Sequence, residues 1–142
     1  MGTVLESLPA RYQVPLRQGF DLSIQERLLP GSEILDVGSG RHPTLKLADR
    51  PPRVRYVGLD LHESELRAAG ENAYDEVFEA DATRFIPEFE NRFDLVISWQ
   101  VLEHVTDMEA TLENLRRYLK PGGRLVAQFS GARSAFGVIN RI

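Results

Sequence analysis

The chain has no cysteine among its 142 residues. Disulfides, thiolate nucleophiles and cysteine-ligated metals are therefore excluded. Histidine is scarce as well: His42, His62 and His104 are scattered without metal-ligand spacing, so we expect no metal site. Positive charge is not in excess either, because 17 basic residues stand against 21 acidic ones and the net charge is −4. Nothing in this balance favours a nucleic-acid partner.

Long apolar runs are also absent. No run reaches the ~20 residues that a membrane-spanning helix needs, and the first residues lack the charged-then-apolar pattern of a secretory signal. We therefore predict a cytoplasmic protein without a membrane partner. A chain of this length is expected to form one domain with its own core. We divide it into a lead-in helix region over residues 1–30 and a main domain over residues 31–142.

Strand-like and helix-like segments alternate from residue 31 onward. Short apolar runs predict strands at 33–37, 54–59, 76–79, 93–98 and 124–129. Helical patterns occur at 21–29, 64–70 and 106–120. Strands that are apolar at consecutive positions are typical of a parallel sheet with helices on both faces. The sequence therefore predicts an α/β fold, with a doubly wound, mostly parallel, Rossmann-like sheet of about five strands.

The helix at 106–120 has the clearest signals. Thr106 and Glu109 form a capping-box pattern at its start. Apolar residues recur with helical spacing and predict its buried face: Met108, Leu112, Leu115 and Leu119. The Pro-Gly-Gly segment at 121–123 predicts the end of the helix before the last strand.

A tight glycine turn follows the first strand. Asp36 ends the apolar run, and Gly38 and Gly40 then form a Gly-x-Gly turn. Two residues without a Cβ let a ligand lie against the backbone. Asp60 closes the next strand about 20 residues later, a spacing that suits a carboxylate accepting hydrogen bonds from both ribose hydroxyls. The pattern indicates a nucleoside-containing cofactor; the other interpretation of Asp60 is a cap of the helix behind it.

A dinucleotide cofactor is the less favoured alternative. Its fingerprint needs a third glycine at position 43, where this chain has Pro43. Proline offers no backbone N–H to a pyrophosphate. A nicotinamide-dependent oxidoreductase is therefore disfavoured.

Six segments together resemble the class I S-adenosylmethionine-dependent methyltransferases, over residues 33 to about 129. They stand in the order and spacing of that family: 34–40 (ILDVGSG), 57–60 (VGLD), 80–82 (ADA), 93–98 (FDLVIS), 101–105 (VLEHV) and 119–123 (LKPGG). The resemblance implies S-adenosylmethionine as cofactor. It also implies transfer of a methyl group to a small-molecule acceptor, whose identity the resemblance does not supply.

The resemblance implies roles for individual residues. Asp36 would orient the methionine amino group, with the backbone of Gly38 and Gly40 at the same end. Asp60 would hold the ribose, and Leu61 would pack against the adenine.

Further residues would complete the site. Asp81 would accept a hydrogen bond from the adenine amino group while the backbone of Ala82 reads the ring edge, although Asp81 could equally cap the segment after it. Ser98 and Gln100 would border the sulfonium and the mouth through which the substrate enters. His104 is the candidate catalytic base, with local packing as the other interpretation. Trp99 is a candidate for stacking on an acceptor ring, and half-buried packing is equally consistent with it.

Some features depart from the family pattern. His42 stands where the family commonly has a third glycine, and its side chain narrows the methionine pocket. Residues 130–142 are too few for the usual C-terminal helix and antiparallel hairpin, which predicts an unprotected edge on the fifth strand and a homo-oligomer through that edge. A catalytically inactive cofactor-binding fragment or interaction module is therefore the alternative function. We interpret the five basic residues between positions 41 and 55 as a solvated face.

Overall fold

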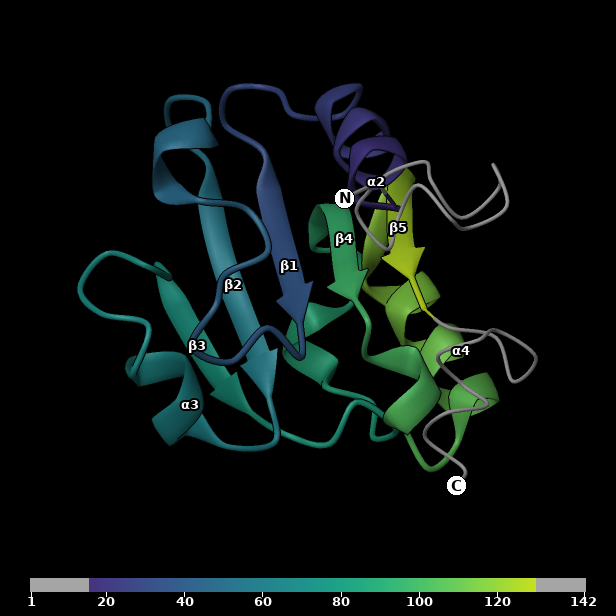
Figure 1. Ribbon diagram of the computed structural model, residues 1–142. Helices are drawn as coiled ribbons and strands as arrows, with labels where there is room; N and C mark the ends of the chain where they lie inside the picture. The colour runs from purple at the N-terminus through teal and green to yellow at the C-terminus, as the bar shows by residue number, and fades with distance from the viewer. Residues whose placement is uncertain (1–15, 130–142) are drawn as a thin grey trace, which may run out of the picture.

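The computed structural model describes residues 16–129 of the chain. Five strands form one sheet, and neighbouring strands pair in parallel in the order β3-β2-β1-β4-β5 (Figure 1). The strands are β1 (Glu33–Val37), β2 (Arg55–Asp60), β3 (Glu76–Glu79), β4 (Phe93–Trp99) and β5 (Leu119–Gln128). The predicted Rossmann-like parallel sheet is confirmed. The predicted lead-in residues 1–15 and the segment 130–142 lie outside the described residues.

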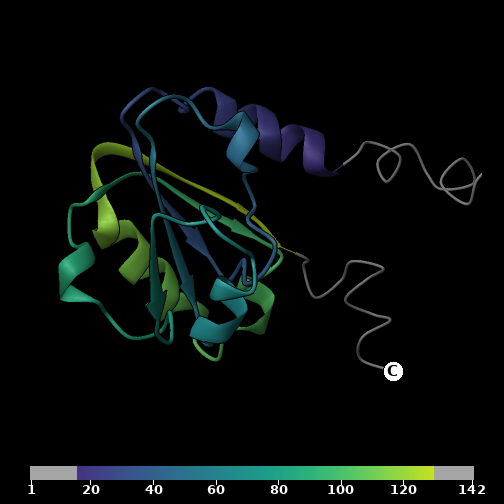
Figure 2. The ribbon, with the colours of Figure 1, turned by 90° about the vertical axis from the view of Figure 1, so that its left-hand side faces the viewer.

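Helices cover both faces of the sheet. The α-helices are α2 (Leu16–Gln25), α3 (Glu63–Arg67) and α4 (Met108–Tyr118). Single 3-10 turns form η2 (Leu47–Asp49), η3 (Pro87–Phe89) and η4 (Leu102–His104). Figure 2 shows α2 and α4 on opposite sides of the sheet. No helix in the part of the chain from 16 to 129 is long and apolar enough to span a membrane.

The sheet separates two cores. On one face, Phe20 and Ile24 of α2 pack with Ile34 of β1. On the other face, Leu115 of α4 packs with Leu35, the next residue of β1. Alternate side chains of a strand point to opposite faces, so the central strands are buried on both sides. This is what their uninterrupted apolar sequences predict.

The start of α4 differs from the prediction. Asp107, and not Thr106, caps the helix, since the Asp107 carboxylate accepts a hydrogen bond from the N–H of Ala110 at 2.9 Å. The buried face also differs, because Leu112 is 37% exposed while Thr111 is fully buried. The prediction is wrong for Leu112 alone, since the other three residues of the predicted face do pack against the core: Met108, Leu115 and Leu119.

Two other boundaries moved. The helix predicted at 21–29 is found one turn earlier, at Leu16–Gln25, because the buried Phe20 and Ile24 anchor that stretch to the sheet. The last strand begins at Leu119 instead of at residue 124: Leu119 already pairs with Phe93, and the 121–123 segment forms an irregularity inside the strand. Within the described residues β5 pairs with β4 alone.

Candidate functional site

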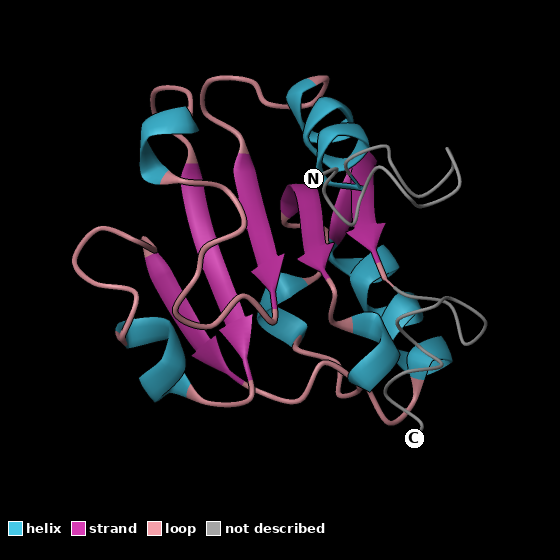
Figure 3. Cartoon of the chain, viewed as in Figure 1, coloured by secondary structure: helices cyan, strands magenta, loops and turns pink. Residues whose placement is uncertain are grey.

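Two cavities open near the carboxyl ends of the strands, where ligands bind in open parallel sheets. These ends and the loops that follow lie along the lower edge of the sheet in Figure 3. The first cavity, of about 320 Å³, lies over the ends of β1 and β2 and reaches η4. Six of the nine predicted site residues line it: Gly38, Asp60, Leu61, Asp81, Ala82 and His104.

The turn after β1 is shaped by glycine. Gly38 has φ +74°, and a Cβ built on it would lie 2.6 Å from Cγ1 of Val101. No other residue fits there without displacing Val101. Gly40, with φ +52°, lines neither cavity but stands beside the site, since its Cβ would lie 3.6 Å from Oδ2 of Asp60. Glycine at position 38 thus lets the Val101 side chain pack against the turn at the end of β1.

Asp60 and Asp81 each hold a local turn with one oxygen only. Oδ1 of Asp60 accepts the N–H of His62 at 3.3 Å. Oδ1 of Asp81 accepts the N–H and the hydroxyl of Thr83, at 2.9 and 2.8 Å, and these hydrogen bonds hold the pKa of Asp81 below its ordinary value. Neither Oδ2 accepts a hydrogen bond from a described residue. The capping and ligand-binding interpretations of both carboxylates are therefore compatible.

Asp36 lies away from both cavities. Its side chain is 0% exposed. Oδ2 accepts the N–H of Thr44 at 2.7 Å and the hydroxyl of Tyr56 at 2.5 Å, and Oδ1 accepts the Thr44 hydroxyl at 2.8 Å. Burial raises the pKa of Asp36 despite these hydrogen bonds, which act in the opposite direction. Thr44 and Tyr56 are thus hydrogen-bond partners of Asp36 within the protein. Its contact with the methionine amino group stays a prediction.

Ser98 also faces the interior. It is fully buried, and its hydroxyl donates to the carbonyl of Val37 at 3.5 Å. The two residues after it reach the cavities instead: Gln100 lines the first and Trp99 the second. Gln100 has φ +56°, a conformation that is uncommon outside glycine. This conformation redirects the chain from β4 toward η4.

Two neighbouring residues of η4 differ in environment. His104 is exposed and lines the first cavity. Both carboxylate oxygens of Glu103 are buried and have no hydrogen-bond partner among the described residues. A buried acceptor of this kind normally receives a hydrogen bond from water or a ligand donor, or contacts an ion. The sequence contained Glu103 only as part of the 101–105 motif, next to the candidate base.

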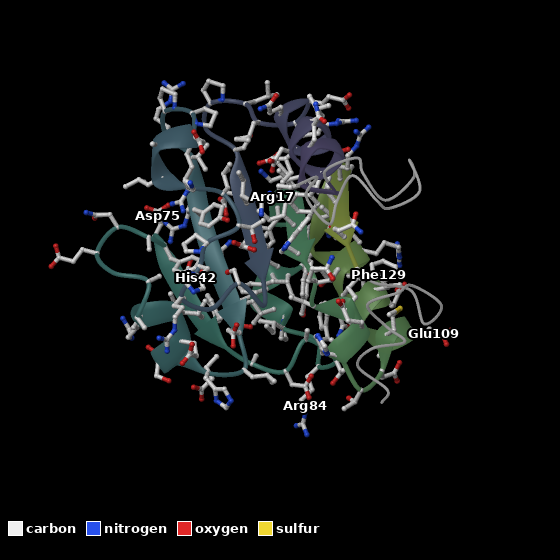
Figure 4. All side chains as sticks on the ribbon, viewed as in Figure 1. Arg17, His42, Asp75, Arg84, Glu109 and Phe129 are labelled. Atoms are coloured by element: carbon white, nitrogen blue, oxygen red, sulfur yellow. The ribbon has the colours of Figure 1, made fainter. Side chains whose placement is uncertain are left out.

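The second cavity, of about 840 Å³, lies between α2 and the loop that follows β1. Arg17 and Asp21 of α2 line one side, and His42 of the loop lines the other; Arg17 and His42 are labelled in Figure 4. The Arg17 guanidinium lies over the Trp99 ring, 5.0 Å from its centroid, while its Nε donates to Asp21 at 2.8 Å. One side of the indole ring is therefore already covered by the protein.

The interpretation of residues 41–55 as a solvated basic face is wrong for Arg50. Its guanidinium lies 3.7 Å from the centroid of the Tyr56 ring and donates to the carbonyls of Leu45 and Ala73. Burial lowers the pKa of Arg50. This arginine is therefore part of the structure around the glycine turn.

Only one described residue, Gly38, lines both cavities. The first cavity offers two carboxylate oxygens that accept no hydrogen bond from residues 16–129, and such acceptors suit ribose hydroxyls and an amino group. The bare turn beside it suits a chain that continues from the nucleoside toward the second cavity. The fold and this arrangement are typical of α/β proteins that bind a nucleoside-containing cofactor at the end of the first strand.

A sequence profile described as a methyltransferase domain matches residues 12–137 of the chain. The chain belongs to this family, the class I S-adenosylmethionine-dependent methyltransferases, which confirms the resemblance seen in the sequence. The cofactor of the family is S-adenosylmethionine. Its ribose hydroxyls and adenine amino group are donors of the kind that the carboxylates of Asp60 and Asp81 in the first cavity can accept.

Curated relatives carry names for more than one reaction. The ubiquinone biosynthesis O-methyltransferase of Maricaulis maris is 30% identical over 71% of this chain and 41% of its own. The ubiquinone/menaquinone biosynthesis C-methyltransferase of Teredinibacter turnerae is 35% identical over 71% and 44%. A mitochondrial arginine-hydroxylase of Homo sapiens is 32% identical over 68% and 28%. The chain thus spans less than half the length of each of these relatives.

Solved structures support the same fold. The trans-methyltransferase CalH, in complex with S-adenosylhomocysteine, superposes with a TM-score of 0.60 at 25% identity, over 78% of this chain and 35% of that one. The [4+2]-cyclase SpnF gives a TM-score of 0.63 at 27% identity, over 80% and 44%. Because similar chains are named for a cyclase and a hydroxylase, the reaction has to be argued from the site.

Proposed function

We propose that this chain binds S-adenosylmethionine and takes part in methyl transfer to a small-molecule acceptor. The observation that carries this proposal is the meeting of the two cavities at Gly38. A cofactor with its nucleoside in the first cavity has its other end directed toward the second. The acceptor then enters through the larger second cavity.

The residues of the first cavity would hold the nucleoside. Oδ2 of Asp60 is free to accept from the ribose hydroxyls and Oδ2 of Asp81 from the adenine amino group. Leu61, which is 60% exposed, gains buried apolar surface when a flat ring covers it. Two charge-assisted hydrogen bonds in a partly dry site contribute about 1.5–3 kcal/mol each.

In the reaction, the protein itself would mainly align the acceptor with the methyl group of the cofactor. S-adenosylmethionine supplies an electrophilic methyl group, so the protein mainly positions the acceptor and excludes water. An acceptor hydroxyl must also lose its proton. His104 stays the proposed base, a role that requires the acceptor hydroxyl to reach the η4 side of the first cavity, which the exposed imidazole lines. An unchanged pH–rate profile in His104→Ala would remove this role.

Calorimetric titration with S-adenosylhomocysteine tests cofactor binding. We expect a dissociation constant near ~10 μM that rises at least tenfold in Asp60→Ala, a loss of ~1.4 kcal/mol. Glu71→Ala, in an exposed loop away from both cavities, is the matched control and is expected to bind like the wild type. No binding by the folded wild-type chain would overturn the proposal.

Turnover on a panel of small-molecule acceptors separates the two functions under consideration. Methyl transfer supports the enzyme, whereas tight binding without transfer to any acceptor supports a catalytically inactive cofactor-binding fragment or interaction module. Cytoplasmic location and the absence of a nucleic-acid partner stay predictions, based on the net charge of −4 and the composition.

A further inference from the structure

Two tyrosines outside both cavities contact the loop that separates them. Tyr56 of β2 and Tyr74, just before β3, stack with their ring centroids 5.8 Å apart. Gly58 of β2 makes room for this stack, because a Cβ built on it would lie 2.8 Å from the Tyr74 ring. Neither tyrosine lines a cavity. Any effect of the pair on a ligand must therefore pass through the loop formed by residues 38–45.

The Tyr74 hydroxyl holds the glycine end of loop 38–45. It donates to the carbonyl of Gly40 at 2.7 Å and lies 2.6 Å from Oγ of Ser39. Since the single phenolic proton is used on Gly40, the Ser39 hydroxyl donates to the tyrosine oxygen. Ser39 itself lines the second cavity. One hydroxyl thus fixes two consecutive residues of the turn.

The Tyr56 hydroxyl holds the other end of the loop. It accepts the N–H of Leu45 at 3.0 Å and donates to Asp36, which in turn accepts both the N–H and the hydroxyl of Thr44. The Arg50 guanidinium covers the outer face of the same ring and donates to the carbonyl of Leu45. Loop 38–45 is therefore held at one end by Tyr56 of β2 and at the other by Tyr74, just before β3.

We propose that Tyr74 and Tyr56 are positioning residues that hold loop 38–45 in the form that binds the amino-acid half of the cofactor. This inference rests on the proposed function, which assigns the adenosine half to the first cavity. Of loop 38–45, only Gly38 lines that cavity. Loss of a tyrosine hydroxyl frees one end of the loop, and the entropy of ordering it then opposes binding of the ligand portion beside it.

Two probes that share adenosine test the inference by calorimetry. S-adenosylhomocysteine carries the amino-acid part, and 5′-deoxy-5′-methylthioadenosine lacks it. Tyr74→Phe removes the hydroxyl and keeps the ring that packs over Gly58. Tyr118→Phe is the matched control, because its hydroxyl accepts the N–H of Ile86 at 2.9 Å in the core on the opposite face. The readout is the ratio of the two dissociation constants.

We expect Tyr74→Phe to weaken S-adenosylhomocysteine at least fivefold and methylthioadenosine less than twofold, with an unchanged ratio in Tyr118→Phe. Tyr56→Phe provides a second measurement, and circular dichroism with thermal melting verifies that each variant is folded. Equal weakening of both probes in the tyrosine variants, or no weakening, overturns the inference and leaves the proposed function intact. Failure of the folded wild type to bind either probe overturns both.

Discussion

Gly38 is the one described residue that lines both cavities, and it provides the sharpest test of the site. In Gly38→Ala the new methyl group must occupy a left-handed conformation, at a cost of about 1–2 kcal/mol, and it meets Val101 at 2.6 Å. We expect loss of S-adenosylhomocysteine binding, measured by calorimetry, and a fall in unfolding free energy in urea.

Gly31→Ala separates the contribution of the contact from that of the backbone. Gly31 has a similar φ of +79°, and a Cβ there meets nothing within 4 Å. The unfolding free energy of Gly31→Ala should fall only by the ~1–2 kcal/mol that the left-handed conformation costs, and this variant should bind S-adenosylhomocysteine like the wild type. Equal binding by both variants would show that the packing of Val101 against Gly38 does not matter for the ligand site.

The sequence predicts where the side chain points for some aspartates better than for others. Asp60 and Asp81 come at or after strand ends, where the parallel topology brings them to the same cavity. Asp36 lies inside a strand, and its direction depends on Thr44 and Tyr56, which approach it only in the folded chain. No local pattern in the sequence contains those contacts.

At the level of single elements, two adjacent residues can be compared as the N-cap of α4. Asp107→Ala removes the hydrogen bond to the N–H of Ala110 and should lower the unfolding free energy by about 1 kcal/mol. Thr106→Ala, at the position that the sequence favoured, should change it by less than about 0.5 kcal/mol. Urea denaturation of both variants decides, and a larger effect from Thr106→Ala would contradict the observed cap.

The bounds of two strands, β1 and β3, were predicted correctly from short runs of extended-type residues. Burial alone does not explain this, because β1 is buried whereas β3 is a half-buried edge strand. The start of β5 was predicted too late, because Pro121 and the two glycines after it are typical of a loop between a helix and a strand. In the structure Leu119 already pairs with Phe93 of β4. A pairing between distant segments thus outweighed the local preference of the chain.

Ion pairs join the strands at the amino end of the sheet, opposite the cavities. Arg92 contacts Glu33 and Glu76 at 2.9 and 2.6 Å, and Arg55 contacts Glu76 at 3.0 Å. Although partial burial opposes it, the hydrogen bonds from the two arginines keep the pKa of Glu76 below its ordinary value. A depressed pKa contributes stability above the ordinary value of 4.5 that is lost as the pH falls through the lowered pKa.

Glu76→Gln should therefore be less stable than the wild type at pH 7, by up to about 1 kcal/mol for partly exposed pairs. The difference should shrink as the pH falls below 4.5, where the wild-type carboxylate is progressively protonated. Urea denaturation across this pH range measures it. Glu71→Gln, which pairs with no described residue, serves as control, and a gap that widens in acid would contradict the ion-pair account.

At the level of the whole molecule, the unpaired edge of β5 predicts association between copies of the chain. Because β5 has a partner strand only on the β4 side within residues 16–129, the prediction of self-association through that edge still stands. Light scattering coupled to size exclusion, over a series of concentrations, should show a mass that rises toward the dimer or beyond. A constant monomer mass would contradict it.

The two cavities draw on nearly separate sets of side chains. The first uses the ends of β1 and β2, residues 80–82 and the segment from 100 to 106; the second uses α2, loop 38–45, residues 46 and 49, and Trp99. In the proposed function the second cavity admits the acceptor and the first holds the nucleoside, so substitutions in α2 would alter acceptor preference without changing the nucleoside site. Under that proposal, α2 is the place to begin a redesign of specificity.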